Sequence, residues 1–180
     1  MWMRSRVDST CSVSRLSEAV VELSKEDGFH EIKLTLVGGV GRKADNKVHE
    51  WIKNHPEIIN YVGPVFEKDK LCELFKSHSV FSMASLHETF GLVYVEALSQ
   101  NLPVIYTKGQ AIDGMFPPNI GVAVNPLSID EIKDAIKVVL QNKEKYSNDG
   151  IDFEMFRWDS ITQKYLDIYH GIYFKNNHIR

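Results

Sequence analysis

The chain has 180 residues, of which 43% are hydrophobic and 25% charged, an ordinary mix for a globular domain that excludes a disordered chain. Its 21 Lys and Arg against 24 Asp and Glu give a net charge of −3, so the overall basic field that nucleic-acid binding needs is absent. The apolar runs are far shorter than the roughly 20 residues of a membrane-spanning helix, and residues 1–11 lack the apolar core of a signal peptide. We therefore expect a cytoplasmic protein without a transmembrane segment and without a nucleic-acid partner.

Helix-like and strand-like segments alternate along the chain. Apolar residues at helical spacing predict a first helix over 14–26, which Asp27-Gly28 ends. The short apolar run 32–37 predicts a strand that Gly38-Gly39 ends. The same criteria predict helices over 45–54, 68–77, 91–100, 128–141 and 158–174, and strands over 58–62, 80–83, 103–107 and 120–124.

This alternation predicts an α/β fold, a doubly wound, Rossmann-like parallel sheet with helices on both faces. In such sheets the crossovers are right-handed, and ligands bind beyond the carboxyl ends of the strands. The residues that carry function are therefore expected in the loops that follow strands.

The first such loop is rich in glycine. Residues 39–44 fit the dinucleotide-binding pattern G-x-G-x-x-G/A, in which glycines let the backbone approach a pyrophosphate. That pattern also wants a carboxylate after the next strand for the ribose, and Gly63-Pro64 stands there instead. Two interpretations stay open: a plain turn into a helix, or a loop that lines a phosphate or nucleotide pocket.

The loop before the helix at 91–100 carries the strongest signal. Glu88 follows a strand, and the backbone N–H groups of Thr89, Phe90, Gly91 and Leu92 would be the unpaired donors of a helix N-terminus, which favours a phosphate. Glu96 stands between Val95 and Ala97 in an apolar segment, where a buried carboxylate is costly without a partner. Two carboxylates around an anion site suit a ligand with a diphosphate in the middle and a sugar at each end. The alternative is that Glu88 is a capping acid and Glu96 is paired with a Lys or Arg.

Here the sequence resembles a known family. Glu88-Thr-Phe-Gly-Leu-Val-Tyr-Val-Glu96-Ala-Leu, followed by Asn101-Leu-Pro-Val, is similar to the E-x7-E signature of retaining nucleotide-sugar glycosyltransferases of group 1, family 4, which have the GT-B fold. Residues 33–39, 61–65, 109–114, 121–126 and 156–159 resemble other segments of that family. The resemblance covers almost the whole chain, and it is confined to the C-terminal, donor-binding half of the GT-B fold.

The resemblance implies a role for each matching residue. Glu88 would be the catalytic-site acid that contacts the transferred sugar, and Glu96 would hold the ribose diol. The donor would also be bound by Thr89, Phe90, Gly91 and Leu92, and by Gly38 and Gly39 after the earlier strand. Arg6 matches a diphosphate-binding arginine, whereas Cys11 falls near the position of the family's lysine. No Asp-x-Asp motif and no histidine pair at ligand spacing occurs, so we expect no metal and no other cofactor.

The resemblance also implies a domain organisation. We expect a nucleotide-sugar-binding domain over 1–157, with a truncated first strand, and a closing helix and tail over 158–180. Six residues of that helix form an apolar stripe: Trp158, Ile161, Tyr165, Ile168, Tyr169 and Ile172. We expect the stripe to pack on its own domain; the alternative implied by the resemblance is that the helix crosses towards a second domain.

Three functions from different classes follow. The first is the donor-binding domain of a retaining, hexosyl-type glycosyltransferase in glycan or polysaccharide biosynthesis, inactive alone because the N-terminal acceptor-binding domain is absent from the chain. Any contact with a membrane would then be peripheral and made through that other domain. The second is an NAD(P)-type dinucleotide-binding module, and the third is an interaction domain without catalytic activity.

Overall fold

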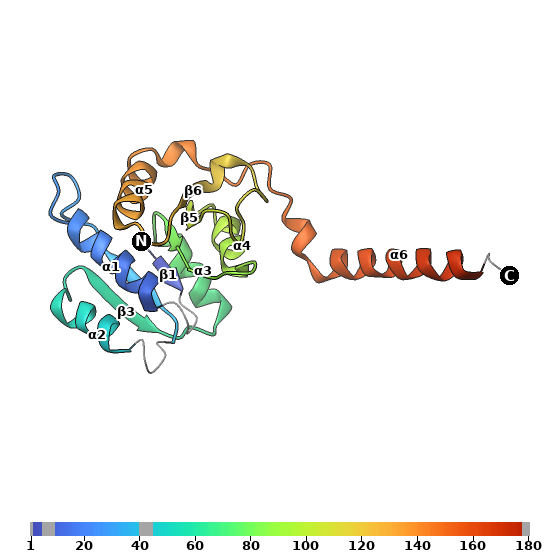
Figure 1. Ribbon diagram of the computed structural model, residues 1–180, viewed down its shortest axis with the longest axis horizontal. Coiled ribbons are helices and arrows are strands. Elements are labelled where there is room, and N and C mark those ends of the chain that lie inside the picture. Colours follow the sequence, from blue (N-terminus) through green and yellow to red (C-terminus); the bar gives the residue numbers. More distant parts are fainter. Residues whose placement is uncertain (1, 5–9, 40–44, 178–180) are drawn as a thin grey trace. The chain divides into compact units, whose positions relative to one another are not determined.

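The computed structural model describes residues 2–4, 10–39 and 45–177 (Figure 1). The chain divides into two compact units, residues 1–149 and 150–180. The second unit contains the short 3-10 helix η3 (Phe153–Phe156), which packs against helix α6 (Trp158–Asn177). The donor-binding domain over 1–157, with its closing helix and tail over 158–180, stays a prediction.

The first unit is built on one parallel sheet. Its strands lie in the order β3-β2-β1-β4-β5-β6, and every neighbouring pair among the described residues is parallel. Strands β2, β4 and β5 are buried along their whole length, as a sheet covered on both faces requires. The bounds are β1 (Trp2–Arg4), β2 (Leu34–Val37), β3 (Ile59–Gly63), β4 (Phe81–Met83), β5 (Val104–Thr107) and β6 (Gly121–Val124). The predicted doubly wound fold is confirmed.

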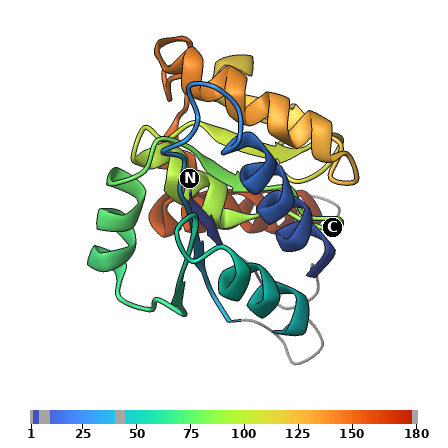
Figure 2. The same cartoon turned by 90° about the vertical axis from the view of Figure 1, so that its left-hand side faces the viewer.

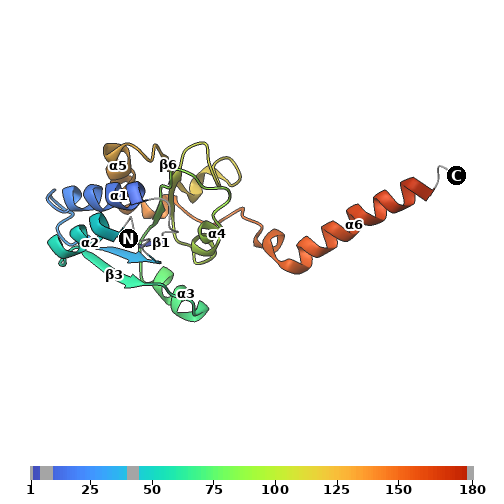
Figure 3. The same ribbon diagram turned by 60° about the horizontal axis from the view of Figure 1, so that its bottom comes forward.

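Helices cover both faces of the sheet. On one face α1 (Thr10–Leu23) packs between α2 (Asp45–Asn54) and α5 (Ile129–Gln141), as Figure 2 shows. On the other face lie α3 (Lys68–Lys76) and α4 (Leu92–Ser99), whose rings Phe75 and Tyr94 both contact Phe81 of β4 at centroid distances of 5.9 and 5.7 Å. In Figure 3, α1 and α5 lie at the top of this unit and α3 lies at its bottom, with β3 between them. Two further 3-10 turns, η1 (Pro118–Ile120) and η2 (Lys143–Lys145), complete this unit.

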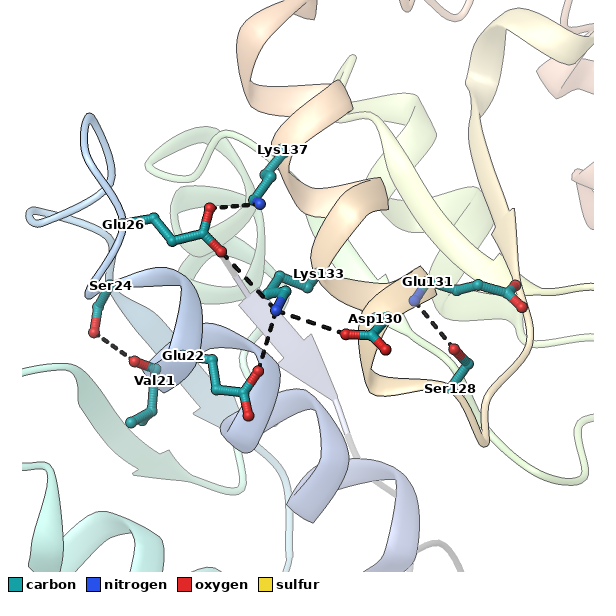
Figure 4. A network of polar contacts seen from close by, with 9 residues as sticks. All are labelled: Val21, Glu22, Ser24, Glu26, Ser128, Asp130, Glu131, Lys133 and Lys137. Atoms are coloured by element: carbon teal, nitrogen blue, oxygen red, sulfur yellow. Dashed lines mark hydrogen bonds and ion pairs between the residues drawn. The ribbon is translucent and has the colours of Figure 1, made fainter.

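Charged side chains join α1 to α5 at the surface (Figure 4). The Lys133 side chain is only 19% exposed, and its Nζ lies 3.2 Å from Glu22 and 3.9 Å from Glu26. Asp130 approaches the same ammonium at 3.6 Å, and Lys137 pairs with Glu26 at 2.5 Å. The donation to Glu22 raises the pKa of Lys133 above the ordinary lysine value. The two helices that follow β1 and β6 are thus held side by side.

The strand order places a topological switch point between β1 and β4. From β1 the chain moves towards β2 and β3, whereas from β4 it moves towards β5 and β6. Trp2 of β1 is in register with Phe81 of β4, so both strands end at the same level of the sheet. The crevice that such a fold offers to a ligand therefore lies beyond Arg4 and Met83.

Helix α6, taken by itself, has an apolar side that faces solvent. The Tyr165 and Tyr169 rings lie 6.4 Å apart, and the Ile168 and Ile172 side chains are also exposed. Of the predicted stripe, Ile161 alone is half-buried, and Trp158 at the start of the helix is the most exposed. Whether the stripe packs on the first unit stays a prediction. Among the described residues, no helix is both long and apolar enough to span a membrane.

Candidate functional site

The segment between β4 and α4, residues 84–91, lies at the switch point and carries Glu88. The Glu88 side chain is half-buried, and its Oε1 accepts the N–H of Thr89 at 3.1 Å. The Thr89 amide, predicted as a free donor of the helix N-terminus, is thus engaged by the preceding carboxylate. This contact folds the Glu88 side chain back over its own loop.

Gly91 forms the junction between this loop and α4. It has φ +70°, a left-handed conformation that suits glycine, and the helix begins one residue later, at Leu92. A Cβ at this position would lie 2.7 Å from two ring atoms of Tyr94 and 3.3 Å from Cγ of Glu88. Two needs therefore require glycine here: the turn itself, and the space that the Tyr94 ring occupies.

Tyr94 ties the first turn of α4 to the end of β4. Its ring is fully buried, and its hydroxyl donates a hydrogen bond to the backbone oxygen of Met83. The ring also meets Phe81 and Tyr106 edge to face. Burial raises the pKa of the Tyr94 phenol, and the nearby charge of Glu88 raises it further. The phenol therefore serves as a neutral hydrogen-bond donor that fixes the start of α4.

The expectation of a buried Glu96 is wrong. Glu96 is exposed. The five buried residues of the eight in α4 are Val93, Tyr94, Val95, Ala97 and Leu98. Glu96 lies four residues after Leu92, which is 65% exposed, so both lie on the solvent side of the helix. Its apolar neighbours in sequence point to the core while Glu96 points away from it. The carboxylate is accessible to a ligand without the desolvation that its sequence context indicated.

Of the two predicted residues after β2, Gly38 is held by hydrogen bonds and Gly39 is exposed. The Gly38 N–H donates to the backbone oxygen of Gly63 at 2.9 Å, and the Gly38 oxygen accepts from the Tyr61 hydroxyl at 2.9 Å. Gly38 therefore continues the β2–β3 pairing one residue past the end of β2. Gly39 is exposed, and a Cβ there would meet nothing within 4 Å.

Part of the predicted site lies outside the described residues. Arg6 falls there, as do residues 40–44 of the dinucleotide pattern, and the placement of the Cys11 side chain is likewise not described. The residues brought together are Glu88, Thr89, Phe90, Gly91 and Leu92, with Glu96 farther along the same helix. Gly38 and Gly39 follow β2, which lies two strands away from β4 in the same sheet because β1 stands between them.

Gln110 belongs to this site, although only its segment, and not its role, drew attention in the sequence. Its Oε1 accepts the N–H of Glu88 at 3.1 Å, and its Nε2 donates to the backbone oxygen of Leu86 at 2.9 Å. One amide therefore brackets the loop on both sides of His87. A single glutamine in a loop belongs to no repeating sequence pattern that would predict its hydrogen-bond partners. They are identified only from the structure, in which β4 and β5 lie side by side.

Among residues 2–4, 10–39 and 45–177, no three His, Cys, Asp or Glu side chains lie close enough together to hold a metal ion. The site as described is thus made of two carboxylates, a glycine turn, a helix N-terminus and an amide clamp, at the switch point of a doubly wound sheet. These features define a Rossmann-like domain whose candidate ligand site is built around the β4–α4 loop.

The chain belongs to the family of group 1 glycosyl transferases, whose family profile matches residues 3–150. Among curated proteins it is similar to the sulfoquinovosyl transferase SQD2 of Arabidopsis thaliana, with 29% identity over 157 residues, 82% of this chain and 30% of that protein. It is also similar to a sucrose synthase of Acidithiobacillus caldus, with 30% identity over 120 residues, 58% of this chain and 15% of that protein. The chain thus spans less than a third of the length of these relatives.

Solved structures share the fold. The crystal structure of HepE from Anabaena in complex with UDP and glucose superposes with a TM-score of 0.73 at 17% identity, over 94% of this chain and 48% of that one. The trehalose-6-phosphate synthase OtsA superposes with a TM-score of 0.67 at 16% identity, over 78% of this chain and 35% of that one. The expected GT-B type of α/β domain is confirmed.

Proposed function

We propose that this chain is the donor-binding, C-terminal domain of a retaining glycosyltransferase that takes a hexosyl group from a nucleotide-diphospho sugar. The observation that carries the proposal is the position of the Glu88–Glu96 segment at the switch point of the sheet, in a chain that belongs to the group 1 family. HepE, which has this fold, was solved with UDP and glucose, which supports a nucleotide-sugar ligand for the present chain.

Each part of the segment has a role in this proposal. The half-buried Glu88 contacts hydroxyl groups of the transferred sugar, and the exposed Glu96 accepts hydrogen bonds from the ribose diol. Between them the N-terminus of α4 meets the diphosphate, where the helix dipole and the N–H groups around Gly91 and Leu92 favour negative charge. The same elements stabilise charge that develops on the leaving diphosphate during transfer.

Transfer itself needs a second body that holds the acceptor. Bringing two reactants together in one cleft supplies a large part of the barrier lowering, and this chain spans only 48% of HepE. We propose that the chain alone binds donor and transfers almost no sugar. Peripheral membrane contact through the acceptor-binding part, a cytoplasmic location and a place in glycan or polysaccharide biosynthesis belong to this same proposal.

Calorimetric titration of the purified chain with UDP, GDP, ADP, their glucose or mannose conjugates, and NAD tests the proposal. We expect binding of one nucleoside diphosphate and its sugar conjugate, and no change when EDTA is added. Binding of NAD without any nucleoside diphosphate would instead support the dinucleotide-binding alternative. Loss of binding on chelation, restored by Mg²⁺ or Mn²⁺, would contradict the metal-independent site proposed here.

Glu96→Gln separates the ligand role of Glu96 from a structural one. Replacing a charged acceptor pair with a neutral amide should cost about tenfold in nucleotide affinity, since hydrogen bonds to charged groups are roughly twice as strong as neutral ones. Because Glu96 is exposed, we expect the stability of the variant to change by less than about 0.5 kcal/mol. Glu144→Gln, at another exposed glutamate, is the matched control and should change neither quantity.

A further inference from the structure

The loop that carries Glu88 is held from the side by β5 and the turn that follows it. Backbone pairing between β4 and β5 runs from Phe81 with Val104 to Met83 with Tyr106. Beyond Met83 and Tyr106, side chains at the end of β5 and after it make hydrogen bonds to the backbone of the Glu88 loop. The Thr107 hydroxyl donates to the backbone oxygen of Ser85 at 2.7 Å in a buried contact.

Gln110 makes the next two contacts of this series. Its amide donates to Leu86 O at 2.9 Å and accepts from Glu88 N at 3.1 Å. One orientation of the amide satisfies both partners, since a flipped amide would set oxygen against oxygen and N–H against N–H. No hydrocarbon or carboxylate of the same length makes this pair of bonds.

The turn that presents Gln110 is itself constrained. The Asp113 carboxylate accepts the Gly109 N–H at 2.5 Å, and the Asp113 N–H returns a bond to Gln110 O at 3.0 Å. Ala111 has φ +51°, which a residue with a side chain rarely adopts unless its surroundings impose it. The residue just before Ala111, Gln110, clamps the candidate site, so strain of this kind indicates that the turn has a defined task.

We propose that Gln110 is a positioning residue that fixes the backbone of the Glu88 loop and thereby aims the Glu88 carboxylate at the transferred sugar. The inference rests on the proposed function of Glu88. It assigns to Gln110 the part of donor affinity that comes from the sugar, and leaves the part that comes from the nucleoside diphosphate to α4 and Glu96.

Two variants test this assignment. Gln110→Met keeps the length of the side chain and removes both hydrogen bonds, whereas Gln110→Glu keeps the acceptor for Glu88 and removes the donor to Leu86. Gln141→Met, at an exposed position at the end of α5, is the matched control for the same chemical change.

Two measurements are made on each protein. Hydrogen exchange of the Glu88 amide, followed by NMR on the free chain, reports whether Gln110 holds the loop, independently of any ligand. The ratio of the affinities for UDP-glucose and UDP, from calorimetry, reports the sugar contribution; GDP-mannose with GDP, or ADP-glucose with ADP, is the probe pair if the chain selects that base.

In Gln110→Met we expect faster exchange at Glu88 and a loss of about tenfold in the affinity ratio, with the affinity for the nucleoside diphosphate alone unchanged. Gln110→Glu should lose the ratio to a similar extent, because the bond to Leu86 is gone and a second carboxylate stands beside Glu88. The control should match wild type in both measurements, and the Gly109 amide, held by Asp113, should keep its protection in every variant.

Unchanged exchange and an unchanged ratio in Gln110→Met would overturn the inference. An equal loss of affinity for UDP and UDP-glucose would overturn it too, because it would show a general structural role. If the wild-type chain binds no nucleotide, the proposed function fails; faster Glu88 exchange in that case leaves Gln110 as the residue that orders the loop and removes its role in sugar binding.

Discussion

Gly91→Ala is the substitution for which the structure gives the clearest consequence. The change adds a single methyl group at the junction of the Glu88 loop and α4. At φ +70° that methyl is strained wherever it points, and it would lie 2.7 Å from two carbons of the Tyr94 ring. Two separate penalties therefore fall on one substitution.

The magnitude follows from how little the ring can move. Tyr94 is fully buried, its hydroxyl is bonded to Met83 O, and its ring meets Phe81 at 5.7 Å and Tyr106 at 6.5 Å between centroids. A left-handed alanine costs about 1–2 kcal/mol, and overpacking of a dense core costs about a further 1–3 kcal/mol. We expect Gly91→Ala to lower the free energy of unfolding by about 2–5 kcal/mol, a large share of the stability of a domain of this size.

Urea unfolding followed by circular dichroism measures this loss, with an unchanged m-value as the check that both states keep their compactness. Gly28→Ala is the control for the backbone penalty alone, since Gly28 has φ +84° and a Cβ there would meet nothing within 4 Å. The two variants should differ by about the overpacking cost of 1–3 kcal/mol. In a Tyr94→Leu background, Gly91→Ala should cost only the backbone penalty, because the obstructing ring is then absent from both members of the pair.

An equal loss of stability in Gly91→Ala and Gly28→Ala would refute the reasoning, because it would mean that the Tyr94 ring yields without cost. A positive result has a consequence for the site. The same Cβ lies 3.3 Å from Cγ of Glu88, so the variant should also lose affinity for a nucleotide sugar by more than it loses affinity for the nucleoside diphosphate.

Three further predictions concern the elements around the site. Asn101, at φ +56°, closes α4 with Leu102 N bonded to Ala97 O, and its Oδ1 accepts the Asn148 N–H at 3.3 Å. Both Asn101→Ala and Asn101→Gly lose that side-chain bond, and Asn101→Ala should be the less stable of the two by about 1 kcal/mol in thermal melts, because alanine alone resists the left-handed backbone. Burial lowers the pKa of His78 below its ordinary 6.5, so on acidification the unfolded chain takes up the proton before the folded chain does. The free energy of unfolding should therefore fall as the pH drops below about 6.5. Urea unfolding at a series of pH values should show this fall in wild type and a smaller one in His78→Gln. Lys133→Met should lower the free energy of unfolding less at high salt than at low salt, because salt screens the ion pairs that Lys133 makes. The raised pKa of Lys133 also predicts that wild type loses stability as the pH rises above the ordinary lysine pKa, and Lys133→Met should not show this loss.

Local sequence patterns predict most of the helices and strands of the fold. The predicted helix 45–54 coincides with α2, and the last helix begins at Trp158 as predicted. The helix predicted over 128–141 is α5, and Ser128 caps it by accepting the Glu131 N–H at 3.2 Å. These features depend on residues within one or two turns of each other, and such spacing can be read without knowledge of any distant contact.

Agreement was weaker where a segment lacks an apolar pattern. Helix α1 begins at Thr10, before the predicted residue 14, because its first turn, Thr-Cys-Ser-Val, has no apolar residues at helical spacing by which to predict it. Ser12 is one of them, and it is almost fully buried in the core. Only the packing of this helix on the sheet decides that Ser12 is covered.

The candidate site divides in the same way. Its position after β4 and its two carboxylates were identified from spacing and from a family resemblance, since both depend on residues within a short stretch. The exposure of Glu96 depends on which side of α4 faces the sheet, and the clamp by Gln110 depends on β5 lying beside β4, with 22 residues separating Gln110 from Glu88. A short apolar helix has no sequence signal for its exposed side, and an amide in a loop has none for its partner, so tertiary packing alone decides both.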